Sequence, residues 1–232
     1  LLPPATIEEI LLVLSQNFSV SPNAEITLEA NPGTVDIQKL QGYRSAGVNR
    51  LSFGVQSFFD DDLRFLTRIH NAGQAKSAIR MARQSGFTNV SLDLIFALPQ
   101  QTMERWTSNL RQAVVLEPEH ISAYGLIVEH NTPLARMVSA KQISPLPSET
   151  EAEMYGVTME YLQHAGYEHY EVSNYGKPGY FSLHNMNYWN HANYLGLGPS
   201  AHSYWSGKRW WNISNVRNYC DIVAAGRFPV AG

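Results

Sequence analysis

Near its middle the sequence reads Val90-Ser91-Leu92-Asp93-Leu94-Ile95-Phe96-Ala97-Leu98-Pro99, a short apolar run that a proline ends. Such a run is typical of a buried strand. It lies between two segments of helical spacing, and further strands are predicted at residues 25–29, 50–56 and 120–126. Because parallel neighbours need a crossover of about a dozen residues, this alternation predicts an α/β fold with a parallel sheet, either doubly wound or part of a β/α barrel.

Helical spacing follows each of the first three strands. The helices are predicted from a cap at Thr34 to about Gly47, through Ala75 and Ala82 to Gly86, and over residues 103–115. After residue 126 the pattern changes: residues 130–148 are predicted to form a loop, and Ser148 with Glu151 forms a capping-box signature for the next helix. We therefore predict two domains, a β/α barrel segment over residues 1–126 and an aromatic-rich α+β extension over residues 127–232 that continues beyond the chain end.

The composition narrows the classes of protein that fit. The chain has 232 residues, of which 44% are hydrophobic and 16% charged, and its net charge is −3. The apolar content is that of a folded protein, and the weak acidity argues against a nucleic-acid partner. No run approaches about 18 apolar residues and no signal peptide opens the chain, so we expect a cytoplasmic protein without membrane insertion. The single cysteine, Cys220, excludes an internal disulfide, and we expect a buried, inert thiol.

Polar side chains fall where the first three predicted strands approach their carboxyl ends. Glu29 closes the first strand, Gln56 closes the second and Asp93 lies inside the third, while Arg68 follows the second strand by twelve residues. Ligand sites of parallel sheets lie at this edge. Two carboxylates, an amide and a guanidinium suit a zwitterionic ligand with hydroxyl groups. The alternative is that Asp93 is a structural acid bonded to backbone N–H groups and that Arg68 is a surface charge.

A second candidate site is His184-Asn185-Met186-Asn187-Tyr188-Trp189. An imidazole beside aromatic rings suits a flat macrocycle with a central metal, with His184 as the metal ligand. The alternative is a β-hairpin whose aromatic residues pack the domain edge and whose histidine is satisfied by hydrogen bonds. The turn Gly196-Leu197-Gly198-Pro199-Ser200 that follows could present backbone N–H groups to an anion.

These motifs resemble those of a known family. Glu29-Ala30-Asn31-Pro32-Gly33, the run from Leu51 to Phe58 and the run from Asp93 to Thr102 resemble the oxygen-independent coproporphyrinogen III oxidase-like group of radical SAM proteins. Within that group, the His-Asn-x-x-Tyr-Trp block and the Gly-Pro-Ser-Ala-His that follows resemble the HemW-type haem chaperones. The resemblance covers essentially the whole chain.

The resemblance implies a partial barrel of about six strands, four of which lie in this chain. It implies that Glu29, Gln56, Arg68 and Asp93 contact S-adenosylmethionine. It also associates His184, Asn185, Tyr188 and Trp189 with haem, and His184 with the haem iron. The function implied is a haem chaperone whose partners are haem and haem-accepting respiratory proteins; the alternatives are an oxygen-independent coproporphyrinogen III dehydrogenase and a catalytically silent binding module.

The chain departs from the family pattern in one respect. The CxxxCxxC motif, whose thiolates hold a 4Fe–4S cluster in the family, is absent, and one cysteine cannot hold such a cluster. We therefore expect this chain to be an excerpt of a longer protein whose cluster ligands lie upstream. By itself the chain is not expected to cleave S-adenosylmethionine reductively.

Overall fold

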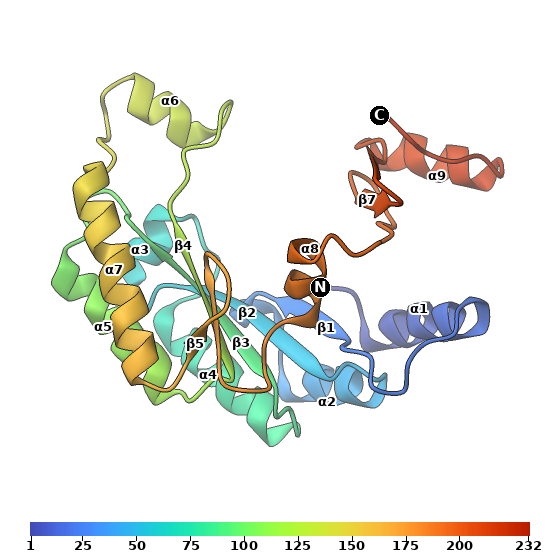
Figure 1. The fold of residues 1–232 in the computed structure, drawn as a ribbon, viewed down its shortest axis with the longest axis horizontal. Coiled ribbons are helices and arrows are strands. Elements are labelled where there is room, and N and C mark those ends of the chain that lie inside the picture. The colour runs from blue at the N-terminus through green and yellow to red at the C-terminus, as the bar shows by residue number, and fades with distance from the viewer. The chain divides into compact units, whose positions relative to one another are not determined.

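The structure is a computed structural model that describes residues 1–232. It forms two compact units, Leu1–Phe181 and Ser182–Gly232 (Figure 1). None of its helices is both long enough and apolar enough to cross a membrane.

The first unit repeats strand and helix along the chain. Its elements are α1 (Pro4–Asn17), β1 (Thr27–Ala30), the 3₁₀ helix η1 (Pro32–Thr34), α2 (Ile37–Ser45), β2 (Arg50–Gln56), α3 (Asp60–Phe65), α4 (Ala72–Gln84), β3 (Val90–Phe96), α5 (Met103–Val115), β4 (His120–Gly125), α6 (Pro133–Ser139), α7 (Ser148–His164), β5 (Glu168–His169) and β6 (Asn174–Gly176). The four predicted strands are all present, and β2 and α5 have the predicted bounds.

The sheet has the order β1-β2-β3-β4-β6-β5. The first four strands pair in parallel, whereas β6 is antiparallel to both β4 and β5. A doubly wound sheet reverses its strand order partway, but here each parallel strand lies next to its predecessor in the chain. This succession is that of a β/α barrel opened along one side, so the predicted α/β partial barrel is confirmed.

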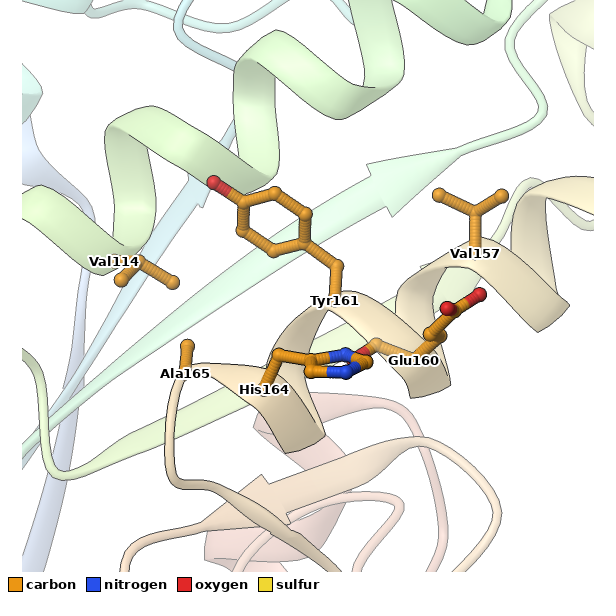
Figure 2. A pocket seen from close by; sticks show the side chains of 6 residues that line it. All are labelled: Val114, Val157, Glu160, Tyr161, His164 and Ala165. Carbon is orange, nitrogen blue, oxygen red and sulfur yellow. The ribbon is translucent and has the colours of Figure 1, made fainter.

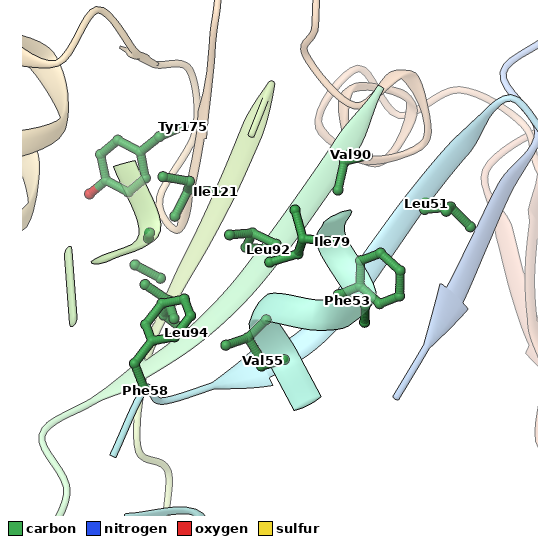
Figure 3. Packing of buried hydrophobic residues seen from close by; sticks show 14 of the residues in the cluster. Leu51, Phe53, Val55, Phe58, Ile79, Val90, Leu92, Leu94, Ile121 and Tyr175 are labelled. Atoms are coloured by element: carbon green, nitrogen blue, oxygen red, sulfur yellow. The ribbon is translucent and has the colours of Figure 1, made fainter. Parts of the chain in front are cut away.

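Alternation along the central strands separates the core from the opposite face of the sheet. Leu51, Phe53 and Val55 of β2 are buried together with Leu92 and its neighbours in β3, and helices α2, α4, α5 and α7 cover these side chains. Figure 3 shows the apolar side chains of β2 and β3 gathered with Ile79 of α4. Because successive residues point to opposite faces, the other face carries the intervening residues Ser52, Gly54, Gln56, Ser91 and Asp93.

Some predictions of where helices begin were wrong, because the side-chain hydrogen bonds of the caps differ from those expected. Helix α2 begins at Ile37 because the Asp36 carboxylate accepts a bond from Lys39 N at 2.8 Å, whereas Thr34 ends a separate 3₁₀ turn. The loop predicted over residues 130–148 contains α6, which the Thr132 hydroxyl caps. Ser148 is the first residue of α7 and caps nothing, because Pro147 stands at the cap position.

The units divide after Phe181, whereas the sequence analysis ends the barrel segment at residue 126. The last parallel strand, β4, does end at Gly125. The chain beyond it returns to the same sheet, since β6 pairs with β4 through Ile121 and Tyr175, and α7 packs its buried Met154 and Leu162 into the same core. The domain boundary at residue 126 stays a prediction. It follows the end of the repeated strand–helix pattern, whereas the compact unit continues to Phe181.

The second unit is small and has little apolar interior. Its elements are α8 (Leu183–Trp189), β7 (His202–Trp205), β8 (Lys208–Trp211) and α9 (Val216–Ala224). Strands β7 and β8 form an antiparallel hairpin, to which Tyr194 adds an isolated bridge with Tyr204. Its buried residues are Ser182, Ser203 and Asn212, and no apolar side chain of this unit is buried.

We expect Leu92→Ala to lower the free energy of unfolding by about 2–5 kcal/mol, because Leu92 is fully buried and the surrounding core can close only part of the cavity left behind. Val115→Ala on α5, where 72% of the side chain is exposed, should change it by less than about 0.5 kcal/mol. Urea unfolding measures both values. Equal effects of the two substitutions would contradict the core described above.

Candidate functional site

The three polar residues predicted near the strand ends and Arg68, which follows the second strand, surround one cavity. Glu29, Gln56, Arg68 and Asp93 all line a pocket of about 360 Å³ on the polar face of β1, β2 and β3. The remaining lining residues are Ala30, Asn31, Ser52 and Gly54. Neither Asn31 nor Ser52 was predicted as a site residue, although the alternation along β2 already puts Ser52 on the face of Gln56.

Strand β2 is shaped to present the Gln56 side chain. Its pairing with β3 shifts register between Phe53 and Gln56, and Gln56 has a φ of +67°, in the left-handed region. A Cβ at Gly54 would lie 2.8 Å from Gln56 Nε2. Glycine at position 54 therefore leaves room for the Gln56 amide to lie back along the strand, which a larger residue would displace.

Arg68 is held by the turn that follows α3. Its backbone N–H donates to Leu63 O at 2.8 Å, and Thr67 before it has a φ of +53°. Two residues later, His70 is buried, and its Nε2 lies 3.1 Å from Val55 O, next to Gln56. The Nε atom of Arg68 is buried without a protein partner. A guanidinium with such an unsatisfied donor fits an anionic ligand group in the pocket.

Asp93 is the most perturbed acid of the pocket. Burial raises its pKa to about 6, while the Ser52 and Ser122 hydroxyls act in the opposite direction, and the Glu29 carboxylate adds to the increase. Ser52 Oγ donates to Asp93 Oδ1 at 3.1 Å. The hydroxyls of neighbouring strands, rather than backbone N–H groups, supply the hydrogen bonds of this carboxyl group. Whether Asp93 is a structural acid or contacts a ligand stays a prediction. Arg68 lies in the same cavity and is not an exposed surface charge.

Together these groups can bind a ligand that carries both a positive and a negative charge. A guanidinium can hold a carboxylate through two parallel hydrogen bonds, and carboxylates can accept from an ammonium group or from hydroxyls. The structure thus brings together all four residues for which contact with S-adenosylmethionine was predicted. That contact itself stays a prediction.

A second polar group on the same sheet face was missed by the sequence analysis. His120 Nδ1 lies 2.8 Å from Ser91 Oγ, and its Nε2 lies 2.8 Å from the Tyr170 hydroxyl. Burial, together with the charge of Arg50, lowers the pKa of His120 to about 3, so this imidazole is neutral. Period-two alternation along β3 and β4 could have placed Ser91 and His120 on this face.

The aromatic segment is helical, so the alternative of a β-hairpin at this position is wrong. Residues 183–189 form α8, whose first turn is capped by Ser182 Oγ, which accepts from Asn185 N at 3.3 Å. His184 and Tyr188 lie one turn apart, with ring centroids 4.7 Å apart in an edge-to-face arrangement. The N-cap and the helical spacing, rather than strand pairing, therefore determine how these side chains are arranged in space.

The side chains of α8 are open to solvent on one side. Exposure is 44% for Tyr188 and 54% for Trp189, and His184 is also exposed, whereas Asn185 is half-buried. An exposed imidazole beside exposed aromatic rings fits a flat metal macrocycle, because the rings cover its apolar face and imidazole is a common metal ligand. The structure therefore keeps together the four residues predicted for haem, and their role stays a prediction.

Two other expectations in the second unit were wrong. The Gly196–Ser200 turn uses its N–H groups internally: Gly196 N donates to Ser203 Oγ at 3.0 Å and Gly198 N to the Tyr219 hydroxyl at 3.0 Å. It therefore offers no free cradle for an anion. Cys220 is exposed rather than buried, because α9 packs no side chain into a core.

Another cavity, of about 400 Å³, lies between α5 and α7. Its lining includes Val114 of α5 with Tyr161 and His164 of α7 (Figure 2). The His164 imidazole there donates to Glu160 O at 2.8 Å within its own helix. His164 and His169 are exposed. No group of three histidine, cysteine, aspartate or glutamate side chains in the chain is arranged to hold a metal ion.

Comparison with known proteins identifies relatives. Residues 1–113 match the radical SAM superfamily. Among curated proteins, the chain is 41% identical over 206 residues to heme chaperone HemW of Bacillus subtilis, covering 89% of this chain and 54% of that protein. It is 43% identical over 198 residues to heme chaperone HemW of Haemophilus influenzae, covering 85% and 50%. The chain thus spans about half the length of the curated relatives it matches.

A solved structure shares the fold. Coproporphyrinogen III oxidase (HemN) from Escherichia coli, described as a radical SAM enzyme, superposes with a TM-score of 0.81 over 99% of this chain and 55% of that one. At 23% identity, this is a likeness of fold. It agrees with the open parallel barrel described above.

We expect Asp93→Asn to raise the free energy of unfolding above pH 6 by roughly 2–3 kcal/mol. The raised pKa means that the folded protein favours the neutral acid. The stability this confers is present below the unfolded pKa of about 4 and is lost as pH rises through about 6; the amide does not ionise. Urea unfolding at pH 4 and pH 8 measures the difference. Glu153→Gln, at an exposed carboxylate of α7, is the control, and the same pH dependence in Asp93→Asn as in the parent would refute the assignment.

Proposed function

Because the chain belongs to the radical SAM superfamily, in its HemW-type group, we propose that this protein is a haem chaperone. It holds haem at α8 and passes it to haem-requiring proteins, with respiratory enzymes as the acceptors. The observation that carries the proposal is the exposed His184–Tyr188 pair on α8. The identity of 36–43% to seven curated proteins named heme chaperone HemW supports it.

His184, Asn185, Tyr188 and Trp189 of α8 have distinct parts in this proposal. His184 supplies the imidazole for the haem iron, and Tyr188 contacts the edge of that imidazole and limits its orientation. Trp189, which is half exposed, provides apolar surface for the macrocycle. Asn185 keeps the first turn of the helix in place through its backbone bond to Ser182.

The pocket of the first unit fits S-adenosylmethionine, which supplies a reactive sulfonium group when bound. Arg68 would hold the carboxylate of its amino-acid part, because the guanidinium has an unsatisfied buried donor. Glu29 and Asp93 would accept from the ammonium and ribose hydroxyl groups, and the Gln56 amide would complete the wall.

The 4Fe–4S cluster of the superfamily does not fit the side chains of this chain. Its one cysteine is exposed on α9, and no cluster of metal-ligating side chains accompanies it. We therefore derive no step through an iron–sulfur cluster. The likeness to coproporphyrinogen III oxidase is one of fold, so the dehydrogenase alternative has less support than the chaperone.

We expect the chain to bind one haem per molecule and His184→Ala to weaken that binding by about tenfold or more, about 1.4 kcal/mol, with a changed Soret band. The reason is the loss of the iron ligand. Haem titration followed by absorbance measures both effects. His191→Asn is a matched control, because His191 is an exposed histidine two residues beyond α8 and asparagine tolerates its left-handed φ of +51°. An unchanged spectrum and affinity in His184→Ala would refute the ligand assignment.

We expect Arg68→Ala to weaken S-adenosylmethionine binding by roughly 1.5–3 kcal/mol, the usual contribution of hydrogen bonds to a charged group. Isothermal titration calorimetry of the chain provides the measurement. Arg64→Ala is the matched control, because this exposed arginine lies one helical turn earlier and outside the pocket. Equal affinities of the parent and Arg68→Ala would remove Arg68 from the site.

A further inference from the structure

Helix α8 is joined to the β7–β8 hairpin by a row of aromatic rings. The Tyr188 ring lies edge-on to Tyr194 with centroids 4.6 Å apart, and Tyr194 stacks on Tyr204 of β7 at 6.2 Å. The backbones of Tyr194 and Tyr204 exchange two hydrogen bonds, of 2.8 and 3.0 Å. The imidazole of His184, which contacts Tyr188, is thus linked to the hairpin through three successive tyrosines.

One face of the hairpin continues this row. Tyr204 pairs directly with Arg209 of β8, and His202 pairs with Trp211, whose ring lies 5.8 Å from the imidazole. Directly paired residues of two antiparallel strands point to the same side, and residues two apart in a strand share that side. The face of Tyr204 therefore also carries Arg209, His202 and Trp211. Lys208 and Trp205 belong to the opposite face.

Arg209 is a cation without a carboxylate partner on this aromatic face. It is exposed and belongs to none of the six ion pairs Lys39–Asp36, Arg50–Glu25, Arg64–Asp61, Arg83–Glu119, Arg105–Asp61 and Arg105–Asp62. Arg209 pairs with Tyr204, which stacks on Tyr194, and Tyr194 contacts Tyr188 of α8. The guanidinium is therefore on the hairpin face that the row of rings reaches.

The charge of the whole second unit favours an anionic ligand. Its charged side chains are Lys208, Arg209, Arg217 and Arg227 against the single acid Asp221. The same unit exposes large apolar side chains, including Trp189 and Trp211, and buries no apolar residue. An exposed apolar patch with a cationic rim suits an apolar molecule that carries acidic groups at its edge.

We propose that Arg209 binds a propionate carboxylate of haem, so that the β7–β8 hairpin completes the site that α8 begins. Haem is an apolar disc with an iron at its centre and two carboxylates on one edge, which matches a row of rings that has an imidazole near one end and a guanidinium near the other. Arginine holds a carboxylate through two parallel hydrogen bonds. The inference rests on the proposed function. It adds the group that would fix how haem is rotated within the plane of its own ring.

The test compares haem with its dimethyl ester, in which both propionates are neutral. We expect Arg209→Ala, in the full chain of 232 residues, to bind haem about tenfold more weakly and the dimethyl ester as tightly as the parent. Arg209→Lys keeps the charge but loses the two-bond geometry, so it should lie between the parent and Arg209→Ala. Lys208→Ala is the matched control, because Lys208 is the neighbouring exposed cation on the opposite face.

The outcomes separate this proposal from the proposed function. If Arg209→Ala binds haem as the parent does while His184→Ala does not, the propionate assignment fails and the haem site remains. If Arg209→Ala loses haem and the ester equally, the arginine acts on the fold of the unit, and the assignment fails. If the parent binds neither compound, the proposal that this chain binds haem fails together with the propionate assignment. Loss of affinity for haem alone supports the proposal.

Discussion

The first unit relies on a period-two alternation along β2 and β3. One set of side chains, such as Phe53 and Leu92, is buried against the helices, and the intervening set, such as Ser52 and Asp93, faces the polar cavity. A slip of one residue in either strand would exchange the two sets, exposing the core and burying the carboxylate. The same hydrophobic free energy that fixes the sheet therefore fixes which residues form the pocket, although none of the pocket residues contributes much to it.

This arrangement carries a free-energy cost on the polar face. A carboxylate at position 93 is desolvated there, which is why its pKa is raised, and the hydroxyls of neighbouring strands offset only part of that effect. His120 on the same face stays neutral for the same reason. Buried groups with perturbed pKa values are common at ligand-binding sites. A cationic or hydroxyl group of a ligand would stabilise the charged form of Asp93, which the protein by itself stabilises only in part. The core must be stable enough to hold these groups in place.

The sequence predicted the features that depend on periodicity and missed those that depend on one hydrogen bond. The bounds of β2 and α5 and the meeting of Glu29 with Asp93 follow from apolar spacing and from the shared edge of parallel strands. The start of α2 does not, because Thr34 and Asp36 are both good caps and only the backbone geometry selects Asp36. Residues 183–189 were ambiguous in the same way: a short aromatic run fits a strand or a helix, and the Ser182 cap decides for the helix.

The exposure of Cys220 was unpredictable for a different reason. An apolar stripe on a helix such as α9 predicts burial only where a core exists to receive it, and the second unit has none. Fifty-one residues held by a hairpin, caps and partly exposed rings have little hydrophobic free energy of their own. A ligand that binds only the folded unit stabilises it in proportion to the logarithm of its concentration over its dissociation constant. If haem is that ligand, its binding adds to the free energy of unfolding of this unit.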